Sequence, residues 1–142
     1  MYIIILGAGT IGTSIAEILI KNQHEVAVID SNEEKCKLID NKLGSISVLG
    51  NISLPNSLLN AGISRADLFI STTKNDAKNM LSCQLAKDYF KVQYTVSITH
   101  SKEISRLLDT INVNYTININ EHITNELIAK IKMLGFNINV SN

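Results

Sequence analysis

The sequence has little that marks a secreted, metal-binding or nucleic-acid-binding protein. Its two cysteines, Cys36 and Cys83, lie far apart and belong to no CxxC or Cys/His cluster, which argues against disulfide scaffolds and zinc sites. The 13 basic and 13 acidic residues cancel, so no basic excess points to nucleic acid or to an anionic membrane surface. No apolar run is long enough to cross a bilayer, and the N-terminus lacks signal-peptide features. We expect a cytoplasmic protein with reduced thiols and no direct membrane insertion.

Short β-branched segments alternate with longer helical periods along the chain. Apolar runs predict strands at residues 2–6, 25–30, 45–50, 66–71, 94–98 and 114–119. Helical spacing predicts helices at residues 10–22, 32–42, 53–63, 75–90, 102–111 and 122–134. Repeated strand–helix–strand units imply a parallel sheet with right-handed crossovers. The sequence therefore predicts one α/β domain of Rossmann type, with a doubly wound parallel six-stranded sheet in the order 3-2-1-4-5-6.

Three glycines, Gly7, Gly9 and Gly12, follow the first predicted strand and open the first helix with the spacing GxGxxG. The first glycine permits a tight turn, the second lets a pyrophosphate approach the backbone, and the third lets helix and strand pack closely. The N-terminus of a helix also offers free N–H groups and a positive dipole end to an anion. This context predicts a phosphate-binding loop.

An acidic residue supports that interpretation. Asp30 closes the second predicted strand, where a carboxylate can accept hydrogen bonds from both ribose hydroxyls of a nucleotide. The same carboxylate would repel a 2′-phosphate, and no arginine follows it. The pattern thus disfavours NADP and favours NAD(H) or another adenine nucleotide.

The stretch "VLGNISLPNSLLNAGISRADLFISTTKNDAKNMLSCQLAK" carries a more specific signal. It resembles the RCK or KTN domain, of TrkA-N type, found in regulators of Trk and Ktr potassium uptake and in related potassium channels. The likeness extends from Met1 to about Ile131. The matching residues are Gly50, Leu58, Ala61, Gly62, Ile63, Ala66, Asp67, Thr73, Asn79, Leu85, Ala86 and Lys87.

The resemblance implies a cytoplasmic regulatory domain rather than an enzyme. Such a domain binds NAD(H), or alternatively ADP, AMP or ATP, forms a homodimer or a higher RCK assembly, and gates a membrane potassium transporter. It implies no catalytic residue and no metal ligand. The residues that it places against the nucleotide are Gly7, Gly9, Thr10, Ile11, Gly12, Asp30, Ser31, Asn51, Ile52, Thr72, Thr73 and Lys74.

The resemblance also implies a division of the chain. Residues 1–134 are expected to form the nucleotide-binding domain, and residues 135–142 a tail that exchanges between protomers or begins a linker. The tail alternates like an edge strand from residue 136 onward. Two interpretations remain for the last helix, whose apolar residues are either core or, with those of the tail, a dimer seam. These apolar residues are Ile123, Leu127, Ile128, Ile131, Phe136, Ile138 and Val140.

The chain departs from the family pattern at positions that touch phosphate or metal. Thr10 stands where the family often has arginine, and residues 97–100 lack an arginine as well. Asn51 replaces an aspartate, and Ala77 and Lys78 replace acidic residues. The missing cations weaken the case for ATP, and the missing acids weaken the case for a divalent ion.

Two other functions remain open from the sequence. The domain could be a structural RCK-like unit that has lost ligand binding. It could instead be an NAD-dependent oxidoreductase, although this needs a substrate pocket and an acid–base group beyond the cofactor fold. His100 follows a strand at the expected ligand edge, but with no partner in the sequence it is interpreted as a surface-loop histidine.

Overall fold

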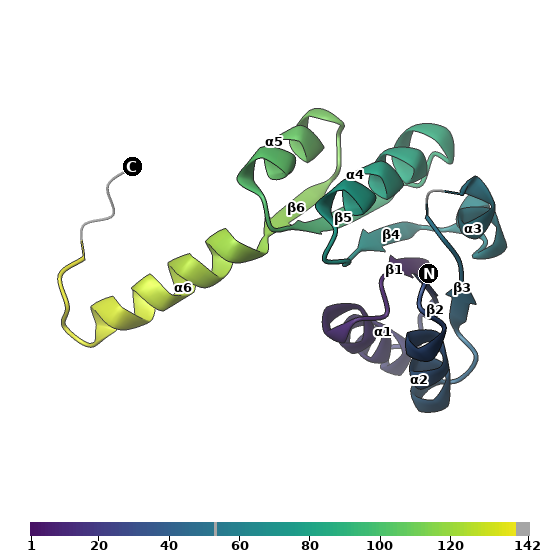
Figure 1. Cartoon of the computed structure of the whole chain (residues 1–142), viewed down its shortest axis with the longest axis horizontal. Coiled ribbons are helices and arrows are strands. Elements are labelled where there is room, and N and C mark those ends of the chain that lie inside the picture. The colour runs from purple at the N-terminus through teal and green to yellow at the C-terminus, as the bar shows by residue number, and fades with distance from the viewer. Residues whose placement is uncertain (53, 139–142) are drawn as a thin grey trace.

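A computed structural model describes residues 1–52 and 54–138 (Figure 1). All six strands lie in one parallel sheet in the order β3-β2-β1-β4-β5-β6, which confirms the predicted Rossmann topology. After β3 the chain crosses to β4, which pairs with β1 on the side opposite to β2. The winding of the sheet therefore reverses between β1 and β4. The strands are β1 (Tyr2–Leu6), β2 (Glu25–Asp30), β3 (Ser47–Leu49), β4 (Leu68–Ser71), β5 (Tyr94–Thr99) and β6 (Tyr115–Asn118).

Helices cover both faces of the sheet (Figure 1). One face packs on α1 and α2, and the other on α3, α4 and α5. The central strand β1 serves both layers, since Ile3 and Ile5 face the first while Ile4 and Leu6 face the second. The helices are α1 (Thr10–Lys21), α2 (Glu33–Leu43), α3 (Pro55–Asn60), α4 (Asp76–Gln84), α5 (Lys102–Thr110) and α6 (Ile119–Met133).

Several element boundaries differ from the sequence predictions for local reasons. Gly62 adopts a φ of 74° and ends the predicted 53–63 helix early, and a short 3₁₀ turn follows it. The third strand begins at Ser47, two residues later than predicted, and the N–H groups of Ile46 and Ser47 there donate to the carboxylate of Asp40. The predicted 75–90 helix changes from α to π geometry after residue 84.

The last helix begins earlier than predicted and leaves the body of the domain (Figure 1). Asn118 caps it by accepting a hydrogen bond from the N–H of Glu121, so α6 starts three residues before the predicted position. No residue of α6 is buried, and Leu127 is 58% exposed. The interpretation of this helix as core is therefore wrong.

The predicted tail strand does not form where the structure describes the tail. Residues 136–138 have no regular secondary structure, and residues 139–142, with Val140, lie outside the described residues. Cys36 and Cys83 are free and buried. Within residues 1–52 and 54–138, none of the helices combines the length and apolarity needed to cross a bilayer.

Candidate functional site

A cavity of about 300 Å³ opens at the carboxyl ends of β1, β2, β3 and β4. This edge includes the point where the sheet reverses its winding, which is where open α/β sheets bind their ligands. Six of the twelve predicted site residues line the cavity. The lining residues are Leu6, Ile29, Asp30, Ser31, Lys35, Gly50, Asn51, Ile52, Thr73, Lys74, Asn75 and Lys78.

The glycine loop is built as the motif requires. Gly7 has a φ of 106°, a conformation that side chains rarely adopt. A Cβ on Gly12 would lie 1.9 Å from the carbonyl oxygen of Gly7, so only glycine allows α1 to pack this closely on the loop. The hydroxyl of Thr72 donates to the carbonyl of Leu6 over 2.9 Å. Thr72, which the resemblance places against the nucleotide, is thus buried behind the loop and supports it from the protein side.

Gly9 and the first turn of α1 face open space. A Cβ built on Gly9 meets no atom within 4 Å, and Gly9 caps α1 without any side-chain hydrogen bond. The first turn of such a helix has N–H groups available for an anion. Gly9 and Thr10 line a separate groove between α1 and α2, which shares Lys35 with the cavity. Ile11 is 39% exposed and lines neither hollow.

Asp30 connects β2 to the glycine loop. One carboxylate oxygen accepts a hydrogen bond from the N–H of Ala8, and the other accepts one from the N–H of Asn32, each over 2.8 Å. A carboxylate oxygen can accept two hydrogen bonds, so each keeps capacity for a ligand hydroxyl. The contacts fix the position of this side chain at the cavity edge before any ligand arrives.

The turn after β4 is held by the buried side-chain amide of Asn79. Asn79 is fully buried, and its Oδ1 accepts hydrogen bonds from the N–H and the hydroxyl of Thr73. Its Nδ2 donates to the carbonyl oxygens of Thr73 and Ile98. Asn79 therefore positions Thr73 in the cavity wall and ties this turn to β5.

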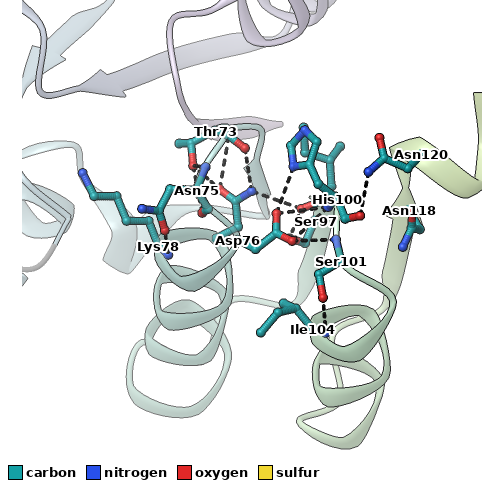
Figure 2. Close-up of polar contacts among 12 residues, drawn as sticks. Thr73, Asn75, Asp76, Lys78, Ser97, His100, Ser101, Ile104, Asn118 and Asn120 are labelled. Carbon is teal, nitrogen blue, oxygen red and sulfur yellow. Dashed lines mark hydrogen bonds and ion pairs between the residues drawn. The ribbon is translucent and has the colours of Figure 1, made fainter.

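His100 is not the isolated surface histidine that the sequence suggests. Its Nδ1 lies 3.0 Å from Oδ1 of Asp76, and the N–H groups of His100 and Ser101 donate to the same carboxylate (Figure 2). Burial acts to raise the pKa of Asp76, but the hydrogen bonds from His100 and Ser101 outweigh it and the pKa is lowered. Asn120 on α6 donates to the carbonyl of His100. The cluster thus joins α4, the end of β5 and the base of α6.

Lys35 and Lys78 add positive charge to the predicted Lys74 in the cavity wall. Lys35, Lys74 and Lys78 line the cavity, and Asp30 is the carboxylate in its wall. Thr10 and residues 97–100 supply no cation to this site, whereas Lys35, Lys74 and Lys78 together give the cavity wall three.

A family model described as the TrkA-N domain matches residues 3–119. The chain belongs to the TrkA-N family. This TrkA-N chain is 37% identical over 89 residues to a Trk system potassium uptake protein TrkA homolog of Methanothermobacter thermautotrophicus, covering 63% of the chain and 41% of that protein. It is 32% identical over 126 residues to the Trk system potassium uptake protein TrkA of Haemophilus influenzae, covering 89% of the chain and 28% of that protein. The chain thus spans less than half of the length of these relatives.

Solved structures share the fold of this TrkA-N chain. The TrkA-N domain of the inner membrane protein ybaL from Escherichia coli superposes with a TM-score of 0.83 at 16% identity, covering 92% of the chain and 96% of that domain. GsuK bound to ADP gives 0.76 at 22% identity, covering 92% of the chain and 33% of that structure. The Shewanella denitrificans Kef CTD in AMP-bound form gives 0.78 at 16% identity, covering 96% and 83%.

Proposed function

We propose that this chain is the cytoplasmic nucleotide-sensing domain of a potassium uptake system and that it gates a membrane potassium transporter. The observation that carries the proposal is the carboxylate of Asp30, held beside the glycine loop at the point where the sheet reverses its winding. The names of the TrkA relatives support the potassium uptake system, and the ADP- and AMP-bound neighbours support an adenine nucleotide.

The proposed nucleotide spans the cavity edge. Its ribose hydroxyls donate to Asp30, and its phosphates lie over Gly9 and the N-terminus of α1. The turn with Asn51 and Ile52 flanks the adenine, and Ser31, Thr73 and Lys74 complete the contacts. NAD(H), ADP, AMP and ATP all carry the adenosine and 5′-phosphate that these groups recognise. Gly7, Gly12 and Thr72 contribute by shaping the loop.

Assembly through α6 completes the proposed switch. The helix presents Ile123, Leu127 and Ile131 to solvent, and an apolar surface of this kind is suited to a second copy of the chain. We assign residues 1–134 to the proposed nucleotide domain and residues 135–142 to a tail that exchanges between protomers or begins a linker. A nucleotide that binds one dimer arrangement more tightly than another shifts the population between them. The dimer or higher assembly then acts on the transporter at the inner face of the membrane.

Hydrogen bonds connect the wall of the cavity to α6, the helix that is proposed to form the dimer. Asn79 connects the cavity wall at Thr73 to β5, and the Asp76–His100 cluster connects the end of β5 to Asn120 on α6. A ligand that moves the turn after β4 thereby also shifts the first turn of α6, the helix that is proposed to form the dimer.

Calorimetry with NADH, NAD, ATP, ADP and AMP tests the proposal. We expect the wild type to bind at least one of them, and Asp30→Ala to lose affinity about 10- to 100-fold because two ribose hydrogen bonds to a charged acceptor are lost. Asp88→Ala removes an exposed carboxylate on the π turn and serves as the control, with affinity unchanged. Binding of none of the five would support a structural domain without a ligand, and hydride transfer to a small substrate would support an oxidoreductase.

A further inference from the structure

Two lysines that line the cavity lie in the first turn of a helix, where a positive charge is unfavourable. Lys35 and Lys78 each lie three residues after an asparagine N-cap, and each donates its backbone N–H to the cap oxygen, of Asn32 and of Asn75 respectively. A positive charge in the first turn opposes the helix dipole, which favours anions at this end. The sequences NEEK and NDAK thus bring two ammonium groups and two positive helix ends to one cavity.

The positive charge in the cavity is not neutralised by the protein. Within the described part of the chain, the ammonium groups of Lys35, Lys74 and Lys78 form no ion pair or hydrogen bond. Asp30 is the carboxylate of the lining, which leaves two more positive than negative side chains around about 300 Å³. An anion with several charges would balance this excess.

The cavity is unsuited to a divalent cation. Asp30 is the one carboxylate among the described lining residues, and the nearby carboxylate of Asp76 turns towards His100 and Ser101 (Figure 2). No group of three His, Cys, Asp or Glu side chains that could hold a metal ion occurs among residues 1–52 and 54–138. A metal bound here would also lie among three ammonium groups that repel it.

We propose that Lys35, Lys74 and Lys78 take the place of a divalent cation, so that the cavity binds adenine nucleotides in their metal-free form and more tightly with each added phosphate. The inference rests on the proposed nucleotide function and specifies the chemical form of the ligand. The first phosphate lies at Gly9, and the phosphates beyond it extend between Lys35 on one wall and Lys74 and Lys78 on the other. Each ammonium group then makes a charge-assisted contact with phosphate oxygen.

Calorimetry on the intact protein with AMP, ADP and ATP, in EDTA and in excess Mg²⁺, tests this inference. In EDTA we expect affinity to increase from AMP to ADP to ATP. Excess Mg²⁺ should weaken ATP binding about tenfold, because chelation removes charge that the lysines would otherwise contact. NADH chelates Mg²⁺ weakly and should bind equally in both buffers, which makes it the internal reference.

Variants separate this role from a structural one. Lys78→Gln should weaken ATP about tenfold and AMP much less, while the melting temperature stays the same or rises because an unfavourable charge leaves the helix N-terminus. Lys91→Gln, an exposed lysine before β5, is the matched control and should change neither. Equal affinity for AMP and ATP, or tighter ATP binding with Mg²⁺, would overturn this inference and leave the proposed function intact. If NADH and all three adenine nucleotides fail to bind, the proposed function itself is wrong.

Discussion

Gly12→Ala should lower the free energy of unfolding, because the added Cβ would clash with the glycine loop. The added Cβ would lie 1.9 Å from the carbonyl oxygen of Gly7 and 2.8 Å from the hydroxyl of Thr72. Both are far inside van der Waals contact and one is backbone, so α1 must move away from the loop, together with Ala16, which it buries completely against the sheet. Overpacking of this severity costs about 3 kcal/mol. For a domain of this size, that lowers the melting temperature by about 10 °C.

Gly9→Ala, three residues earlier, is the matched comparison. Gly9 has a φ of −80°, which alanine adopts readily, and its added Cβ meets no protein atom within 4 Å. The stability should stay within about 0.5 kcal/mol of wild type. Nucleotide affinity should nevertheless fall about 10- to 100-fold, because the methyl group occupies the space that a phosphate needs.

Thermal unfolding by circular dichroism and calorimetric titration with ADP measure both effects. The expected pattern is a lower melting temperature for Gly12→Ala, and normal melting with weak binding for Gly9→Ala. A Gly12→Ala protein whose melting temperature lies within about 2 °C of wild type would refute the packing argument, because the expected loss of stability requires a larger decrease. Wild-type affinity in Gly9→Ala would refute the approach of phosphate to this backbone.

Three further changes probe the surroundings of the site. Asn79→Ala removes a buried amide with four hydrogen bonds and should cost about 3 kcal/mol in urea denaturation; a cost below about 1 kcal/mol would contradict its role in holding the turn. Asp76→Ala leaves two backbone N–H groups without their acceptor and should cost about 2 kcal/mol at pH 7. Because the folded-state pKa of Asp76 is lowered, its stabilisation is complete above the ordinary value of 3.8 and is lost as pH falls below it, so the difference from wild type should narrow at pH 3 and not widen. Leu127→Glu places a charge on the exposed face of α6 and should convert the proposed dimer to a monomer in sedimentation velocity, whereas a surviving dimer would show that another surface associates.

The parts of this molecule that follow from local pattern were predictable. The all-apolar run of β1 is buried on both faces because helices cover each side, and repeated βα units permit few strand orders. Gly7 and Gly12 were identifiable because their roles depend on backbone geometry within one loop. A ligand site at the carboxyl ends of the strands was predictable because Asp30 lies at the end of a predicted strand.

Contacts between distant segments were not predictable from pattern. Asp76 and His100 are 24 residues apart, and no periodicity relates them. The convergence of Lys35 and Lys78 depends on where two helices start around a shared cavity, although the repeated spacing from an asparagine cap was a usable signal. The apolar residues of α6 could not be assigned to core or surface, because helical spacing alone does not say whether a covering element exists.

A crystal structure of the protein with ADP would show directly whether the nucleotide lies where we propose. We expect the diphosphate within hydrogen-bonding distance of the backbone N–H groups at the start of α1, beside Gly9, and the ribose hydroxyls on the carboxylate of Asp30. A nucleotide bound only in the groove between α1 and α2, with its ribose away from Asp30, would contradict the proposed site.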